Sequence, residues 1–487
     1  MALQDSLRSG TTWLITKGTG SFAVQFVFGV ILARLLVPEE FGMMVTIQIF
    51  TGLATVVAVG GMSKALVQAR EVEQRHYNTA FTLQLLIGTG LFLLFYLLAW
   101  PFAAWYDDPL YRPLLQTAAV GFLLRPLMNT QAAWMHREMR FKAFALVSFG
   151  GMFLSGLAGI AMAWHGMGVW SLVLSGLLGT FIQILLSKRV VRLPLALQLD
   201  RRAVGDLGRY GVRIQANNVA FHINRQVENF LISRTLGEHF LGLYNKAGSL
   251  FQIPAEMIGT PAYATTFRAL SKLQDNADQS RWLYRRTLSL VTLYMLPIYV
   301  SLFWLAPAFI TLVYGPNWSP AALPLQILSL IGLSQCIIRP SRAVTAARNW
   351  LGRELALQVE SALVIAVGCL IGLRWGMVGV AWAMVPCQAW IALRFFALAR
   401  RSLGARWSDL PAALAAPVLL NLLLFGFLAG LDGLWQQQLG GGTISWPYLF
   451  GMAAAAVLFY LLMFLTLPLA GIRDEAQRWR RWLLRRG

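Results

Sequence analysis

Two arginines, Arg125 and Arg339, are each followed directly by proline inside a long apolar stretch. The stretches read FLLRPLMNTQAAW (122–134) and CIIRPSRAVTAAR (336–348), and both contain the pattern RP(x)5AA. A guanidinium group presents a planar fork of N–H donors that matches phosphate. The proline leaves the carbonyl four residues earlier without its helical donor, so we expect a kink there that water in a cavity satisfies. The pattern therefore predicts paired sites for an anionic ligand, above all a phosphate group.

A second set of polar side chains lies in the segment RYGVRIQANNVAFHINRQVENFLISR (209–234). At 100° per residue, these side chains fall on or beside one stripe about 60° wide: Asn218, His222, Arg225, Glu228 and Asn229. An earlier segment, TTWLITKGTGSFAVQF (11–26), places Lys17 and Gln25 on one face. Because a lipid-facing helix would not carry such a face, we expect the two helices to face each other across a water-filled cavity.

Each of these polar residues also has a structural interpretation. An intramembrane arginine can serve only to pair with a carboxylate, and Glu228 is placed to form an ion pair with Arg225 or Lys17. His222 can be a hydrogen-bonded structural histidine rather than a proton carrier. Arg125 stands twelve residues before Arg137, about 18 Å along a helix, which is too deep for easy snorkelling to the headgroups.

The composition indicates whether the segments that carry these residues lie in water or in lipid. Of the 487 residues, 57% are hydrophobic and 13% are charged, and apolar segments long enough to span a bilayer recur along the whole chain. The formal charge of +20 comes from short basic loops rather than from one face or tail, which argues against nucleic acid. The sequence predicts an all-α polytopic membrane protein.

Fourteen transmembrane helices are expected. Their ranges are 13–36, 41–66, 78–104, 113–135, 143–164, 167–187, 210–234, 240–267, 287–313, 321–347, 355–373, 376–397, 410–430 and 447–470. Alternate loops are rich in Lys and Arg, whereas the opposite set of loops has only Arg112 and Arg374. Because basic loops stay in the cytoplasm, both termini are predicted to be cytoplasmic. We identify no removable signal peptide.

The sequence also repeats itself. ARLLVPEEFG (33–42) is echoed by SRTLGEHFLG (233–242), and WHGMGVW (164–170) by RWGMVGVAW (374–382). A repeat with an even number of helices starts and ends on the same side of the membrane, so both copies have the same orientation. We therefore expect two pseudo-symmetric six-helix lobes. The expected parts are an N-terminal lobe (1–188), a cytoplasmic connecting loop (189–208), a C-terminal lobe (209–400), and two further helices with a basic cytoplasmic tail (401–487).

The chain offers no catalytic or metal-binding pattern. We find no metal-ligand spacing, P-loop, Rossmann glycines or serine-hydrolase elbow, and the loops are too short for a soluble catalytic domain. We interpret Asp107 and Asp108, which precede Pro109, as part of a solvated turn. The three cysteines are interpreted as small core residues. We therefore expect no catalytic residue, no metal and no enzyme.

The stretch NRQVENFLISRTLGEHFLGLYNKAGSLFQIP (224–254) and its counterpart ILARLLVPEEFGMM (31–44) resemble the polysaccharide-transporter branch of the MOP superfamily. This branch contains the Wzx-like flippases and their colanic-acid-exporter-like relatives, and the resemblance covers essentially the whole chain. It implies the MOP flippase fold, in which the two added C-terminal helices form a groove for a polyprenyl tail.

The resemblance implies a flippase of the bacterial inner membrane. Its substrate would be an undecaprenyl-diphosphate-linked oligosaccharide, an O-antigen, exopolysaccharide or capsule repeat unit, moved to the outer leaflet by alternating access. The residues expected to meet the diphosphate are Lys17, Arg125, Arg225 and Arg339. The cavity residues considered for ion coupling are Gln25, Asn218, His222, Glu228 and Asn229. No cofactor is expected beyond a coupling ion, H⁺ or Na⁺, and the expected state is a monomer that meets polysaccharide assembly proteins.

Three other functions stay open. A multidrug or ion antiporter of the same superfamily shares the fold but should prefer an acidic cavity, whereas the bases expected here outnumber the acids. A lipid II flippase would use the same lipid carrier with a different glycan. An O-antigen polymerase or other polyprenyl-phosphate enzyme would need a large outward loop, which the sequence lacks.

Overall fold

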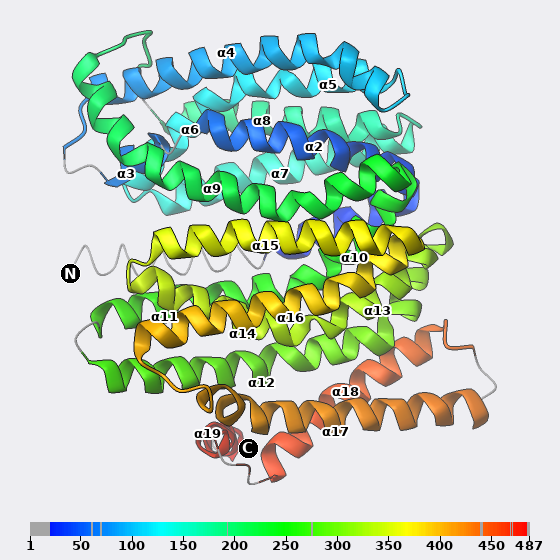
Figure 1. Cartoon of the computed structure of the whole chain (residues 1–487). Helices are drawn as coiled ribbons and strands as arrows, with labels where there is room; N and C mark the ends of the chain where they lie inside the picture. Colours follow the sequence, from blue (N-terminus) through cyan, green and yellow to red (C-terminus); the bar gives the residue numbers. More distant parts are fainter. Residues whose placement is uncertain are drawn as a thin grey trace. The chain divides into compact units, whose positions relative to one another are not determined.

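The computed structural model describes residues 20–59, 62–68, 71–191, 193–273, 276–438, 442–467, 469 and 471–484. These described residues form helices and connecting turns and contain no strand (Figure 1). The chain divides into two compact units, Met1–Gly242 and Leu243–Gly487. Lys17, one of the expected phosphate contacts, lies outside the described residues.

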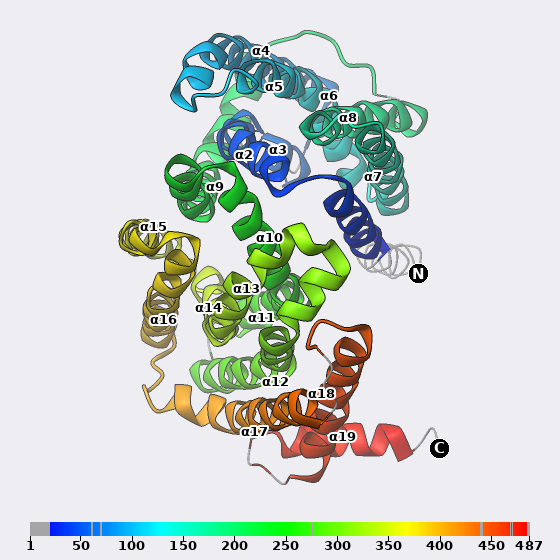
Figure 2. The same ribbon diagram turned by 90° about the vertical axis from the view of Figure 1, so that its right-hand side faces the viewer.

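Among the described residues, the first unit contains a helix over Gly20–Leu35 and eight further helices that lie wholly within it. They are α2 (Pro38–Val59), α3 (Met62–Gln68), α4 (Gln74–Trp105), α5 (Tyr111–Ala119), α6 (Gly121–Arg137), α7 (Phe141–Trp164), α8 (Val169–Val190) and α9 (Arg201–Leu236). Neighbouring helices run alongside one another, and α7 and α8 form a closely packed pair (Figures 1 and 2). The start of α10 (Glu238–Pro254) completes the unit.

The second unit continues from α10. It contains α11 (Thr260–Lys272), α12 (Ala277–Phe309), α13 (Ala322–Leu330), α14 (Gly332–Ala347), α15 (Leu351–Gly372), α16 (Gly376–Leu403), α17 (Asp409–Gln438), α18 (Trp446–Thr466) and α19 (Arg473–Leu484). α17 packs along α12, and α15 pairs with α16 (Figure 2). A π-helical turn over Ala255–Gly259 separates α10 from α11.

The described part of each predicted span is largely helical, but some ends are not, and several spans are interrupted. The predicted helix 113–135 breaks at Val120, and the predicted helix 321–347 bends by 52° between Leu330 and Gly332. Among the described residues, eight helices are long and apolar enough to cross a membrane, or up to nine if the bent pair is one span. That count takes the α15–α16 pair as one stretch, Leu351–Leu403. The count of fourteen spans is therefore not confirmed.

The two helix breaks lie several residues before Pro126 and Pro340, the prolines at which the sequence predicted kinks. Pro126 lies inside α6 and Pro340 inside α14. In both cases the break comes directly before the first residue of the helix that contains the proline. The carbonyl that Pro126 leaves without a helical donor, that of Phe122, packs against Gly88 of α4, where a Cβ atom would overlap it. The proline thus exposes a backbone group to a neighbouring helix, and Gly88 permits the close approach.

The sequence did not predict α19. This amphipathic helix lies in the segment expected to be a basic tail, and its Glu475 accepts hydrogen bonds from Arg286 and Tyr294 of α12, both of 3.0 Å. The carbonyl of Gly471 accepts a further bond from Arg286. Side-chain contacts of this kind hold α19 against the end of α12.

Candidate functional site

Arg125 is half-buried and points into a small cavity of about 10 Å³ in the first unit. Its Nη1 donates to the hydroxyl of Thr55 on α2 at 2.6 Å. Gln84 of α4 and Asn129 of α6 also line the cavity, which has room for about one water molecule. Three helices, α2, α4 and α6, thus position the polar groups around this guanidinium.

The cavity around Arg125 contains a cation and one amide donor without a partner among the described residues. Gln84 is 1% exposed, its Oε1 accepts from Asn129 Nδ2 at 3.4 Å, and its Nε2 has no hydrogen-bond partner among the described residues. Within that same part of the chain, no carboxylate forms an ion pair with Arg125. A half-buried cation beside an unpartnered N–H donor can stabilise an anion.

Arg339, in the second unit, has a different environment. Its Nη1 donates to the hydroxyl of Thr260 at 2.9 Å, and its Nη2 forms an ion pair of 3.2 Å with Glu256 Oε1. Thr260 in turn donates to the other carboxylate oxygen of Glu256 at 3.1 Å. Gly259 lies directly beside the Arg339 side chain, because a Cβ there would come within 3.1 Å of the arginine Cδ. Arg339 is therefore already neutralised.

The two arginine sites correspond through the internal repeat. Thr55 and Thr260, which accept from Arg125 and Arg339, are 205 residues apart, and the same offset pairs Thr51 with Glu256. Where the second site has a carboxylate one turn before the threonine, the first site has a hydroxyl that donates to the Ile47 carbonyl. The repeat thus keeps the arginine and the threonine but supplies a counter-ion on one side only.

Arg225 and His222 lie on α9 (Arg201–Leu236), within the helix that the sequence predicts. Their joint role with Arg125 stays a prediction. Arg225 is exposed, and its Cζ lies 5.8 Å from the ring centroid of Phe221. The imidazole of His222 packs over Gly52 of α2, where a Cβ would come within 2.8 Å of it. His222 therefore occupies a space that only a glycine leaves open.

The remaining predicted polar residues have varied surroundings. Asn229 donates to Gln226 at 2.9 Å, one turn earlier on the same helix. Gln25 is exposed, and Asn218 and Glu228 are half-buried. The roles expected for them in ion coupling stay predictions.

Glu256 is the residue that sequence reasoning missed. It lies in the π-helical turn Ala255–Gly259, and such turns are frequent at functional positions. Its segment was predicted as an uninterrupted helix, 240–267, and no pattern in that segment predicts which arginine it meets. The only signal was a carboxylate within an apolar stretch, four residues before a threonine.

The model of one protein family matches residues 31–323, more than half of the chain, and its description reads "Polysaccharide biosynthesis protein". The chain belongs to the polysaccharide biosynthesis protein family. This match confirms the resemblance inferred from the motifs around 31–44 and 224–254.

Curated relatives of this family member are similar over most of their length. "Lipopolysaccharide biosynthesis protein WzxC" of Escherichia coli (strain K12) is 22% identical over 431 residues, which is 87% of each chain. "Succinoglycan biosynthesis transport protein ExoT" of Rhizobium meliloti (strain 1021) is 23% identical, covering 78% of this chain and 76% of the relative.

Solved structures confirm the MOP-type helical fold. The structure described as "Lipid II flippase MurJ, inward closed conformation" matches with a TM-score of 0.67 at 14% identity, covering 92% of this chain and 97% of its own. An inward-facing multidrug resistance MATE family transporter of the MOP superfamily matches with a TM-score of 0.63, also at 14% identity, over 79% and 94% of the two chains. With its apolar helices, the family member is a multi-pass membrane protein.

Proposed function

We propose that this family member is a flippase for a polyprenyl-diphosphate-linked oligosaccharide. It moves the lipid-linked repeat unit of a cell-surface polysaccharide from the cytoplasmic to the outer leaflet of the bacterial inner membrane, with both termini in the cytoplasm. Two lobes alternate access to a central site, driven by an H⁺ or Na⁺ gradient. The names of the relatives from Escherichia coli and Rhizobium meliloti support a role in polysaccharide assembly and transport.

The observation that carries this proposal is the unneutralised Arg125. Its guanidinium has a hydroxyl partner and neighbouring amide donors but no carboxylate among the described residues. A diphosphate offers acceptors and a negative charge that complement this guanidinium. Because the cavity holds only about one water molecule, the helices around Arg125 must move apart to admit it. Arg339 already binds Glu256, so a phosphate at this arginine would compete with that carboxylate. We therefore assign first contact with the diphosphate to Arg125.

The experiment compares Arg125→Gln and Arg125→Lys by export of the lipid-linked glycan, normalised to membrane protein level. We expect Gln to reduce export at least about tenfold, and Lys to restore it in part, because a point charge lacks the bidentate fork. Arg353→Gln is the matched control, since Arg353 is exposed and stacks on Trp350 at 4.0 Å. Normal export by Arg125→Gln would refute the assignment.

A second experiment distinguishes the proposed substrate from the substrates of other proteins that share this fold. Purified full-length protein in proteoliposomes is offered a polyprenyl-diphosphate-linked repeat unit, lipid II or a cationic dye. Movement of the repeat unit alone supports the proposal. Equal movement of lipid II would make the protein a lipid II flippase, and dye transport alone would make it a multidrug antiporter.

A further inference from the structure

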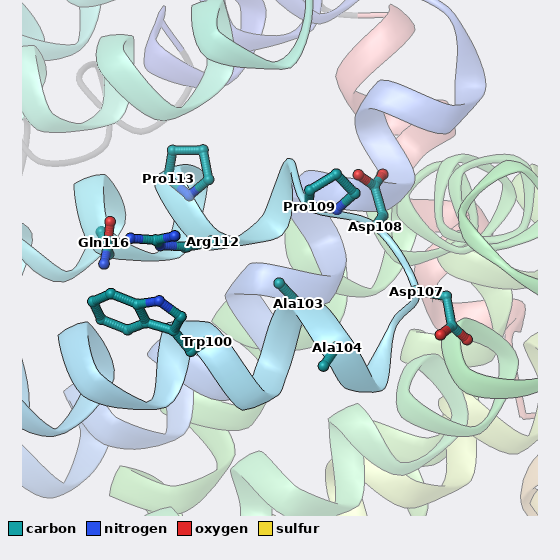
Figure 3. Close-up of a pocket in the computed structure, with 9 residues that line it drawn as sticks. All are labelled: Trp100, Ala103, Ala104, Asp107, Asp108, Pro109, Arg112, Pro113 and Gln116. Carbon is teal, nitrogen blue, oxygen red and sulfur yellow. The ribbon is translucent and has the colours of Figure 1, made fainter.

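A pocket of about 670 Å³ opens where α4 ends and α5 begins, and the transport site proposed above uses none of its residues (Figure 3). Its polar lining consists of Trp100, Asp107, Asp108, Arg112 and Gln116. The volume lies within the range of about 300–1,000 Å³ that is typical of small-ligand sites. The pocket is therefore large enough for a lipid headgroup or a sugar.

The position of the pocket along α4 indicates its depth in the membrane. α4 is long and apolar enough to span a membrane over Gln74–Trp105, and the pocket lies at the C-terminal end of that range. Trp100 and Trp105 are 45% and 42% exposed at this end. Because tryptophans gather at the boundary between hydrocarbon and water, the pocket lies at the level of the lipid headgroups.

Opposite charges occupy separate ends of the pocket. Figure 3 shows Asp107 and Asp108 on one side, with carboxylates that point in different directions, and Arg112 beside Trp100 and Gln116 on the other. The Cζ of Arg112 lies 4.1 Å from the ring centroid of Trp100, and no described carboxylate forms an ion pair with this arginine. The pocket thus offers acceptors at one end and a cation at the other.

The backbone of the turn holds the Asp108 carboxylate in place and leaves Asp107 exposed beside it. Asp107 is exposed and has a φ of 56°, a left-handed conformation that aspartate tolerates better than most residues. Asp108 Oδ1 accepts from the Leu110 N–H at 2.8 Å, which leaves its second oxygen for a ligand. The turn therefore presents negative charge by its own geometry.

We infer that this pocket binds the headgroup of a zwitterionic aminophospholipid. The ammonium would donate to the second oxygen of Asp108, with Asp107 adding negative charge beside it, and the phosphate would accept from Arg112. Two carboxylates against one guanidinium disfavour a purely anionic headgroup. A sugar is a poorer fit, because Arg112 covers a face of Trp100. Exposed leucines on α4, Leu93 and Leu97, offer apolar surface for the acyl chains.

The test uses the purified full-length protein in detergent. It is titrated with equal amounts of phosphatidylethanolamine, phosphatidylcholine and phosphatidylglycerol, and retained lipids are counted by native mass spectrometry. We expect phosphatidylethanolamine to be retained over phosphatidylcholine, because only its primary ammonium donates hydrogen bonds to carboxylates. Arg112→Gln should reduce its retention by about tenfold, the effect of losing a charge-assisted hydrogen bond.

Arg374→Gln is the matched control. Arg374 is exposed, stands beside the exposed Trp375, and lies at the same end of the membrane in the predicted topology. The double variant Asp107→Asn/Asp108→Asn keeps the turn chemistry and should shift retention toward phosphatidylglycerol. Equal retention of the three lipids by the unmodified protein, or equal losses in Arg112→Gln and Arg374→Gln, would overturn the inference. Selective retention of a polyprenyl-diphosphate glycan that Arg112→Gln abolishes would also overturn it.

Discussion

His239 and Glu39 occupy the same position in the two sequence repeats, and their side chains meet, with His239 Nδ1 2.6 Å from Glu39 Oε1. The backbone repeats this relationship. Gly42 packs against the carbonyl of Glu238, and Gly242 packs against the carbonyl of Pro38. All four backbone positions belong to the first unit. The two equivalent helix starts, those of α2 and α10, therefore contact each other with a local two-fold symmetry.

The symmetric glycine contacts should tolerate no side chain. Gly42→Ala and Gly242→Ala each place a Cβ into a backbone carbonyl, which cannot move aside as a flexible side chain would. Overpacking of this kind costs about 1–3 kcal/mol. We expect a lower thermal midpoint for each purified variant. Gly248→Ala, on α10 with nothing within 4 Å, should match the unmodified protein, and equal midpoints for all three variants would contradict the contact.

A reversible cross-link tests whether the contact between α2 and α9 must open during transport. Thr46 of α2 and Ser233 of α9 are buried, and their hydroxyl oxygens lie 2.8 Å apart. A Thr46→Cys/Ser233→Cys variant should form a disulfide that blocks glycan export, and reduction should restore export. The single variants Thr46→Cys and Ser233→Cys are the controls. They retain the three native cysteines, which are buried. Unchanged export by the fully oxidised variant would rule out opening at this contact.

Arg125 has no carboxylate partner in the described part of the chain, and a mutation can supply one. Thr51→Glu places a carboxylate one turn before Thr55, as Glu256 stands before Thr260 in the other repeat. Because the new carboxylate would neutralise Arg125, we expect export to fall at least about tenfold, equivalent to about 1.4 kcal/mol. Thr51→Gln has the same size without the charge and should export normally. Loss of export in both variants would assign the effect to packing.

Arg225 allows a test of the ion pair that the sequence suggested. Since the guanidinium is exposed and lies near Phe221, the single variant Arg225→Gln should insert at normal abundance. If Arg225 served only to neutralise Glu228, the single variant would express poorly and the double variant Arg225→Gln/Glu228→Gln would recover. The measurement is membrane abundance together with glycan export. Lost export at normal abundance in both variants would support contact with the diphosphate.

The sequence by itself determined the class of the protein and the position of its helices. Long apolar segments cannot satisfy their backbone groups in lipid unless they are helical, so composition and length are enough to predict them. The RP(x)5AA pattern and the repeated 33–42 and 233–242 motifs likewise identified the equivalent arginines, because duplication preserves local sequence. The prolines indicated irregular helices but not where the breaks would fall.

Only the tertiary structure decided which arginine is neutralised. Arg125 and Arg339 have the same local pattern, yet among the described residues Arg125 donates to Thr55 and pairs with no carboxylate, whereas Arg339 meets Thr260 and Glu256. Periodicity assigns residues to a face of one helix, whereas an ion pair depends on which faces of two distant helices pack together. Glu256 reaches Arg339 from a π-helical turn 83 residues earlier, which local sequence does not encode. The charge of each site is therefore a property of helix packing.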